Sequence, residues 1–233
     1  MRKVATQAVG AVVSGRRGRP RADQAGEVEE RVLNVATRLF LSHGFDRTTF
    51  EGLAEEAQAG KATLYARYRN KEALYEAVVR RRVAQSVARI SAASDGGVSR
   101  ENLLGVAMLL ADEIFVPDVI ALMRLTIAEV TRFPEMALAT YRIGYGGCVS
   151  ALAEIIAGQG HTPEMLVAAT PAATRFVERV FMPLQMHALY GVDLPSLRLR
   201  AREDVAHAVD GLLAEGVRDV RKAVHSPSTF KTR

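Results

Sequence analysis

The chain of 233 residues is long enough for one large or two modest domains, each with its own hydrophobic core. Its single cysteine, Cys148, excludes an internal disulfide framework and any metal site built from several cysteines, and it is consistent with a reducing cytosol. Although 48% of the residues are hydrophobic, no uninterrupted apolar run approaches the length of a membrane span, so we expect a cytoplasmic protein that does not enter a membrane.

Positive charge is concentrated at the N-terminus. Residues 1–25 contain six Arg and Lys side chains and one Asp, a balance of +5 that equals the formal net charge of the whole chain. We expect residues 1–26 to form a disordered basic arm, because they lack the apolar pattern of a docked element. Such an arm attracts phosphates and is therefore a candidate DNA contact, with a solubilising tail as the alternative.

A Gly-Arg-Pro core flanked by arginines lies within this arm. An extended Arg-Pro segment is narrow enough for the DNA minor groove, where the negative potential favours arginine. We therefore assign Arg17, Arg19 and Arg21 to DNA binding, either by insertion into the minor groove or by loose contact with phosphates.

Residues 27–43 have the apolar spacing of one amphipathic helix. Acidic residues at its start favour the positive end of the helix dipole. Gly44 can adopt the left-handed conformation that ends a helix, and Phe45 can fold back onto the last turn. We expect the helix to end at His43.

The stretch from residue 48 to residue 74 has the pattern of two short helices joined by a tight turn and followed by a longer helix. Thr48 and Glu51 have the spacing of a capping box, in which a hydroxyl and a carboxylate each satisfy a free backbone amide. The second helix resumes for little more than one turn, so it needs packing against a neighbour. We expect this packing to come from core residues Leu53, Ala54, Leu64 and Tyr68.

The short second helix would display a cation and two hydroxyls, on Lys61, Thr63 and Tyr65. This is the layout of a helix-turn-helix whose second helix enters a DNA major groove. Asn70 is placed to cap the next helix, and Lys71 lies in its first turn. The ammonium of Lys71 and the free amides of that turn could share one phosphate.

Between Val28 and Leu74 the sequence resembles the DNA-binding domain of TetR-like repressors. The resemblance rests on Leu53, Ala54, Ala57, Lys61, Thr63, Leu64, Tyr65, Tyr68, Asn70, Lys71, Glu72 and Leu74. The family usually has Gly in the turn and Ser at the cap of the recognition helix, where this chain has Gln58 and Gly60, and Tyr68 replaces the preferred Phe. The resemblance implies a DNA-binding repressor that binds a palindromic operator as a homodimer.

Seven residues of this region are candidate DNA contacts: Thr48, Thr49, Lys61, Ala62, Thr63, Tyr65 and Lys71. We expect Lys61 and Thr63 to face bases or nearby phosphates, and Tyr65 and Lys71 to hold the DNA backbone. The two threonines at the start of the supporting helix would contact phosphate.

The rest of the chain has helical patterns and no sustained alternation typical of strands, so the expected fold class is all-α. A helix from residue 71 to about 90 includes three consecutive arginines, Arg80 to Arg82, which we interpret as a solvated face. Further helices are expected at residues 100–115, 118–133 and 134–158, in a short piece from 162, and at 171–190 and 199–213. The expected domains are a helix-turn-helix DNA-binding domain at 27–74, a larger ligand-binding and dimerisation domain at 75–216, and a C-terminal tail at 217–233.

Residues 128–135 resemble part of the ligand-binding domain of one TetR subgroup. This resemblance implies an all-α regulatory domain whose last two helices form a dimeric four-helix bundle. Two apolar stripes late in the chain agree with such a bundle. The residues we assign to the dimer interface are Val177, Phe181, Leu184, Val209, Leu212 and Leu213.

Methionines and aromatic residues recur in the second domain, and such side chains either line adaptable pockets or fill cores. The candidate ligand-pocket residues are Met108, Phe115, Met123, Tyr141, Tyr145 and Phe176. Gly144, Gly146 and Gly147 lie within a helical pattern, where each costs on the order of 1 kcal/mol relative to Ala. We interpret them as allowing either close helix packing or space for a ligand near the two tyrosines.

The sequence offers little for catalysis. Cys148 has no nearby His to activate it, and a pair such as His207 and Asp210 is too small a set for a zinc site. We therefore expect no catalytic residues, metal or cofactor. Two functions remain: a repressor that a small molecule releases from a palindromic operator, or a constitutive or architectural DNA-binding protein whose helical domain only dimerises. A drug-sized pocket between residues 100 and 186 would favour the first, and a filled core the second.

Overall fold

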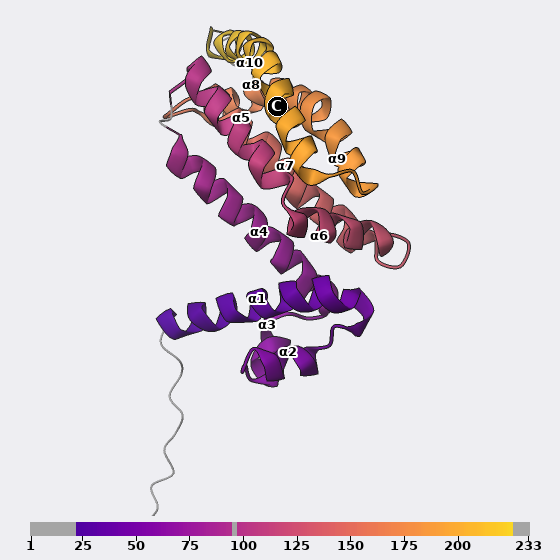
Figure 1. Cartoon of the computed structure of the whole chain (residues 1–233). Coiled ribbons are helices and arrows are strands. Elements are labelled where there is room, and N and C mark those ends of the chain that lie inside the picture. Colours follow the sequence, from indigo (N-terminus) through magenta and orange to yellow (C-terminus); the bar gives the residue numbers. More distant parts are fainter. Residues whose placement is uncertain (1–21, 95–96, 226–233) are drawn as a thin grey trace, which may run out of the picture.

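The computed structural model describes the backbone of residues 22–94 and 97–225, and the side chains of residues 26–94 and 97–221. Within these ranges every regular element is a helix, which confirms the all-α prediction (Figure 1). None of the described helices is both long enough and apolar enough to cross a bilayer. The predicted DNA contacts of Arg17, Arg19 and Arg21 lie outside the described residues.

The N-terminal unit consists of three helices and the first turns of a fourth: α1 (Ala22–Arg47), α2 (Phe50–Glu56), α3 (Lys61–Arg67) and α4 (Lys71–Ala93). Gly44 has a φ of 81°, as a helix-ending glycine requires, and Phe45 folds back so that its ring lies 5.7 Å from that of Phe40. The helix thus breaks at Gly44, directly after the predicted end at His43, although a short helical stretch within α1 continues to Arg47. The predicted start was wrong, because the helix already begins at Ala22, within the segment expected to be a disordered arm.

α4 connects this unit to the larger helical region (Figure 1). The side chain of Asn70 accepts a hydrogen bond of 2.9 Å from the backbone amide of Ala73, so the predicted cap is confirmed. At 23 residues α4 is about 35 Å long. It therefore packs against α1 near its start and against helices of the larger region farther along.

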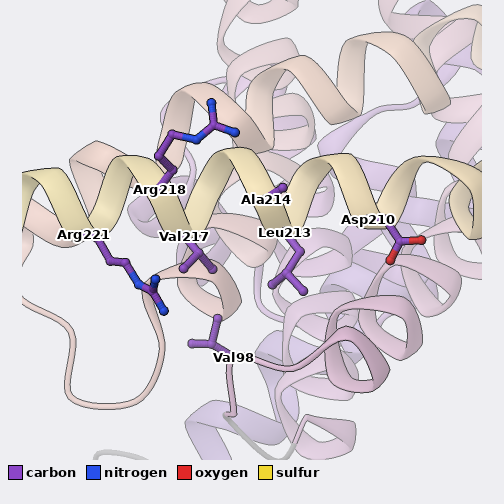
Figure 2. A pocket seen from close by; sticks show the side chains of 7 residues that line it. All are labelled: Val98, Asp210, Leu213, Ala214, Val217, Arg218 and Arg221. Atoms are coloured by element: carbon purple, nitrogen blue, oxygen red, sulfur yellow. The ribbon is translucent and has the colours of Figure 1, made fainter.

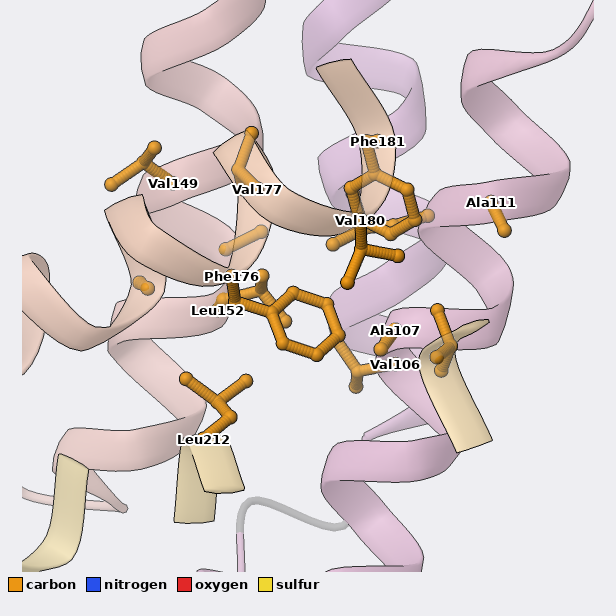
Figure 3. Packing of buried hydrophobic residues seen from close by; sticks show 14 of the residues in the cluster. Val106, Ala107, Ala111, Val149, Leu152, Phe176, Val177, Val180, Phe181 and Leu212 are labelled. Carbon is orange, nitrogen blue, oxygen red and sulfur yellow. The ribbon is translucent and has the colours of Figure 1, made fainter. Parts of the chain in front are cut away.

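The larger region contains α5 (Arg100–Ile114), α6 (Pro117–Ala128), α7 (Pro134–Ala157), α8 (Pro163–Phe176), a π-helical turn η1 (Val177–Phe181), α9 (Met182–Leu189) and α10 (Leu194–His225). Its core lies where α5, α7, α8, η1 and α10 meet. Figure 3 shows Phe176 and Phe181 there, with ring centroids 5.8 Å apart, close to Leu152 of α7 and Val106 of α5.

Three helices of the larger region differ from the predictions. Pro171 lies inside α8 and does not begin a helix, because Ala169, Ala172, Ala173 and Phe176 on the same helix remain buried and compensate for one missing backbone hydrogen bond. α10 continues past Gly216 to His225, through nine residues expected to belong to a tail. A side chain at Gly216 would lie 2.5 Å from Ile156, so this glycine permits close packing and does not end the helix.

The third difference concerns α6, which ends at Ala128 and not at residue 133. The next residues form a turn in which the amide of Phe133 donates to the carbonyl of Glu129 over 2.8 Å. Pro134 disfavours a helical conformation at the residue before it, and Phe133 has a φ of −131°. The turn brings residues 129–133 toward the N-terminal unit.

Candidate DNA-binding surface and internal cavity

The start of α2 is capped by Thr49 and not, as predicted, by Thr48. The hydroxyl oxygen of Thr49 accepts a hydrogen bond of 3.1 Å from the amide of Gly52. Thr48 is only 1% exposed, and its hydroxyl donates to the carbonyl of Gly44 over 2.8 Å. Because the chain turns sharply after Gly44, Thr48 points into the corner between α1 and α2. The predicted contact of its side chain with a phosphate was therefore wrong.

α3 is a seven-residue helix anchored by buried Leu64 and by Tyr68 just beyond its end. Leu53 and Ala54 of α2 are also buried, so all four predicted core residues of this region are confirmed. The opposite face of α3 is exposed and carries Lys61, Ala62, Thr63 and Tyr65. Gly60 caps α3 without a side-chain hydrogen bond.

Tyr65 is held in place although its side chain is 52% exposed. Its ring stacks on Phe50 of α2 with centroids 4.8 Å apart, and its hydroxyl donates to a carboxylate oxygen of Glu51 over 3.2 Å. Desolvation, followed by the charge of Glu51, raises the pKa of Tyr65 above its usual value. The hydroxyl is therefore neutral at physiological pH and lies at a defined position on the exposed face.

Lys71 contacts the corner between α1 and α2. Its ammonium donates to the backbone carbonyl of Asp46 over 3.1 Å and lies 4.7 Å from the centroid of the Phe45 ring. The carboxylate of Asp46 in turn accepts a hydrogen bond of 2.6 Å from Arg132, in the turn after α6, and this bond lowers the pKa of Asp46. Lys71 thus stabilises a corner that the larger region also contacts.

The prediction that the three consecutive arginines of α4 form a solvated face was wrong for two of them. Arg81 donates to the carboxylate of Glu30 and to the amide oxygen of Asn34, both on α1 and both over 2.9 Å. Arg82 points the other way, toward α5. Only Arg80 is exposed.

A cavity of about 340 Å³ lies among α4, α5, α6, α7 and the η1–α9 segment. Met123, Tyr141 and Tyr145 line it, as predicted, and the two tyrosine rings stack 5.2 Å apart. Its other lining side chains are mostly apolar, among them Val83, Leu110, Ile114, Leu122, Ile127, Met182 and Met186. Ile127, Tyr141, Met182 and Met186 are also exposed, so the cavity opens to solvent between α6, α7 and α9.

The other three predicted pocket residues are not part of this cavity. Phe115 and Phe176 are buried in the core, at 0% and 4% exposure, and Figure 3 shows Phe176 there. Met108 contacts Arg202 of α10. α5 instead presents Leu110, Glu113 and Ile114 to the cavity.

The glycines of α7 have two different surroundings. A side chain at Gly147 would lie 2.5 Å from Val83, so this glycine allows α7 to pack closely on α4. Gly144 lines the cavity and has open space where a side chain would be. Gly147 therefore fits the interpretation of close helix packing, Gly144 leaves the open space that the other interpretation requires, and nothing in the structure explains Gly146.

One wall of the cavity carries a network of charged groups that sequence analysis missed. The carboxylate of Glu113 accepts hydrogen bonds from Arg82 (2.9 Å), Ser86 (2.9 Å) and Arg89 (2.7 and 2.5 Å). These bonds, that of Arg89 above all, lower the pKa of Glu113 to about 2. The partners lie 24 to 31 residues apart on two helices, so no local pattern could reveal the network.

The thiol of Cys148 also lies on the cavity wall. Burial raises its pKa to about 11, so the thiol is neutral and poorly nucleophilic at physiological pH. Across the described residues, no group of three or more His, Cys, Asp and Glu side chains is arranged to hold a metal ion.

The predicted dimer interface was wrong for five of its six residues. Figure 3 shows Val177, Phe181 and Leu212 packed inside the core, and Leu184 and Val209 are buried in the same cluster. All five are at most 4% exposed in a single chain, because α8 and α10 pack against each other and against α7, and α10 also packs against α5. Leu213 alone is partly exposed, in a shallow surface groove that it shares with Val98 and Val217 (Figure 2).

Comparison with known proteins places this geometry in a family. Residues 32–78 match the family described as "Bacterial regulatory proteins, tetR family", and residues 101–215 match the "AefR-like transcriptional repressor, C-terminal domain". An uncharacterised HTH-type transcriptional regulator of Mycobacterium tuberculosis is 31% identical over 108 residues, which are 46% of this chain and 50% of that protein. The HTH-type transcriptional repressor ComR of Escherichia coli is 36% identical over 73 residues, or 31% and 33% of the two chains.

The chain thus spans at most about half the length of these curated relatives. Among solved structures, a TetR-family transcriptional regulator from Mesorhizobium loti superposes with a TM-score of 0.60 at 22% identity, over 82% of this chain and 97% of that one. The flavonoid-responsive regulator FrrA superposes with a TM-score of 0.52, also at 22% identity, over 85% and 97%. At this identity the two structures show a shared fold.

The helix-turn-helix geometry of α2 and α3 and the two family matches, one to each helical region, lead to the same assignment. The family consists of transcriptional regulators and not of enzymes. The chain belongs to the TetR family of DNA-binding transcriptional regulators.

Proposed function

We propose that this protein is a repressor that binds a palindromic operator as a homodimer and leaves it when a small molecule enters the cavity. The proposal rests on the observation that α6 lines the cavity and also contacts the N-terminal unit. Met123 and Ile127 of α6 line the cavity, while the carbonyl of Leu122 accepts a hydrogen bond of 2.7 Å from Tyr75 of α4, in the N-terminal core. A ligand that displaces α6 would therefore disturb contacts with the DNA-binding unit.

The turn after α6 supplies two further contacts to the same unit. The rings of Phe133 and Phe45 lie 4.9 Å apart, and Arg132 pairs with Asp46. These residues lie at the corner that precedes α2, so movement of the turn would tilt α2 and α3 relative to the partner protomer. Two recognition helices must face successive major grooves roughly 34–36 Å apart, and a small tilt breaks that match.

The proposed DNA contacts follow the exposed surface. Lys61, Ala62 and Thr63 would face bases or nearby phosphates, while Thr49 and Tyr65 would hold the backbone. The arginines of the N-terminal arm would add contacts in the minor groove or with phosphates. Lys71 is proposed to act mainly by holding the corner between α1 and α2, in view of its contacts there.

We place the dimer interface on the outer faces of α8 and α10, which the two chains would share. Val167 of α8 and Leu199 of α10 are 72% and 61% exposed, so both large apolar side chains are accessible to a partner. Gly211 of α10 has nothing within 4 Å of the position of an added side chain, so a second helix could approach closely there. Val167→Glu should yield monomers in sedimentation and abolish specific DNA binding, whereas dimers of unchanged affinity would contradict this placement.

The proposed function is tested with an operator obtained by in vitro selection from random DNA. Small molecules that raise the melting temperature of the full-length protein should weaken its binding to that operator. Gly144→Leu should fill the cavity and remove the response without preventing DNA binding. If stabilising molecules leave operator binding unchanged, the constitutive DNA-binding function is correct.

Arg132→Gln tests whether ligand binding in the cavity acts on the DNA-binding unit through the turn after α6. We expect it to bind both the small molecule and the operator, but to release the operator less completely when the small molecule is bound. Arg100→Gln is a matched control, because Arg100 pairs with Asp210 of α10, away from the DNA-binding unit. Equal release by both variants would remove Arg132 from the proposed route.

A further inference from the structure

The charged wall of the cavity has a composition that points to one class of ligand. Among the described residues that line the cavity, Arg82 and Glu113 are the ones charged at neutral pH. Arg89 stands behind Glu113 and contacts it without lining the cavity itself. The three groups together have a net charge of +1, next to a lining that is otherwise mostly apolar.

The two arginines are not equivalent. Arg89 uses two nitrogens on the two carboxylate oxygens of Glu113, at 2.7 and 2.5 Å, a bidentate arrangement that satisfies the carboxylate by itself. Arg82 reaches that carboxylate through one nitrogen, while another donates to the hydroxyl oxygen of Ser86. Arg82 is therefore the cation that can exchange partners without leaving Glu113 unpaired.

We propose that the effector is a small hydrophobic carboxylic acid, with its carboxylate on Arg82 and Ser86 and its apolar body between the methionines and tyrosines of the cavity. This inference rests on the proposed function and specifies the ligand of the same cavity. An incoming carboxylate replaces Glu113 on Arg82 while Arg89 keeps Glu113 paired, so each of these partly exposed charges retains a partner. A cationic ligand would have to take Glu113 from both arginines.

The size and lining of the cavity indicate the shape of the apolar part of the ligand. A volume of about 340 Å³ is at the small end of ligand pockets, so it accommodates a medium-length chain or a pair of fused rings. Met123, Met182 and Met186 can adapt to either shape because methionine side chains are flexible.

The experiment uses the full-length protein and isothermal calorimetry at pH 7.5 with two matched pairs of compounds. Decanoic acid is compared with decanamide, and 2-naphthoic acid with 2-naphthamide, so that each pair differs in charge and hardly in shape. For at least one pair we expect the acid to bind about ten- to a hundredfold more tightly than the amide, the size of a charge-assisted hydrogen bond.

Three variants distinguish the inference from a merely structural role of the network. In Arg82→Met the acid and its amide should bind with nearly equal affinity. In Glu113→Gln the preference for the acid should increase, because the carboxylate of Glu113 no longer competes for Arg82. Arg202→Gln is the control: it breaks a surface pair with Asp112 on α5, outside the cavity, and should keep the wild-type ratio. Circular dichroism of each variant verifies the fold.

Amides that bind as tightly as acids, an unchanged preference in Arg82→Met, or the absence of binding by all four compounds would each overturn the inference. The operator-release assay keeps this failure separate from failure of the proposed function. If molecules of another class stabilise the protein and release DNA, the protein is ligand-responsive and only the assignment of the acid is wrong.

Discussion

The N-terminal unit and the larger region bury their apolar side chains in different ways. In the first, Phe40, Phe45 and Tyr75 pack ring against ring at 5.1 to 5.9 Å, and ion pairs tie α3 and α4 to α1. The second contains a filled core and, beside it, a cavity bounded by flexible side chains. A reader of DNA must hold its recognition helix rigidly, whereas a sensor needs a wall that can move. α6 belongs to both, and there the two requirements meet.

The largest expected effect concerns the aromatic core of the N-terminal unit. Phe40→Ala should lower the free energy of unfolding by about 3–5 kcal/mol, because a buried ring is lost and the surrounding rings cannot collapse into the space. Met123→Ala, at the cavity wall, should cost less than half as much. Urea denaturation measures both, and equal losses would contradict the difference in packing between the two regions.

The glycines of α7 sharpen the comparison within a single helix. Gly147→Ala should destabilise the protein by about 1–3 kcal/mol, since the new methyl group would lie 2.5 Å from Val83 where α7 meets α4. Gly144→Ala should instead stabilise it by up to about 1 kcal/mol, because it faces open space and gains helix propensity. Thermal unfolding of the two variants should give shifts of opposite sign.

A smaller effect depends on pH. The pKa of Glu113 falls from an ordinary value of 4.5 to about 2 in the folded protein, so the stabilisation is fully present above about pH 5 and is lost as the pH falls toward 2. We expect Glu113→Gln to cost at most about 2 kcal/mol at pH 7, since partial exposure of the network screens its charges. The difference from wild type should shrink steadily below pH 4.5, and a constant difference would show that the carboxylate charge is not its cause.

The smallest effect is expected at Tyr68, where the family prefers Phe. Its hydroxyl is buried and has no hydrogen-bond partner in the described structure, so the N-terminal unit contains an unsatisfied polar atom. Tyr68→Phe should therefore stabilise the protein by up to about 1 kcal/mol without changing operator affinity. A loss of stability would mean that the hydroxyl has a partner in solution.

Local features of the chain were predictable, and contacts between distant residues were not. The Asn70 cap, the Gly44 helix end and the exposed face of α3 each depend on a few neighbouring residues. The Arg132–Asp46 and Arg82–Glu113 pairs join residues 86 and 31 positions apart, which no spacing reveals. The late apolar stripes illustrate a different limit: a stripe predicts burial, but whether the same chain or a partner covers it depends on the tertiary packing.

Hydrogen exchange of the full-length protein, with and without a bound cavity ligand, tests most directly whether α6 couples the cavity to the DNA-binding unit. We predict that the ligand changes the exchange rates of α6 and of residues 45–49 together, and that Arg132→Gln retains the first change and weakens the second. A ligand that changes exchange in α6 and leaves residues 45–49 unaffected in the wild-type protein would contradict the proposed coupling.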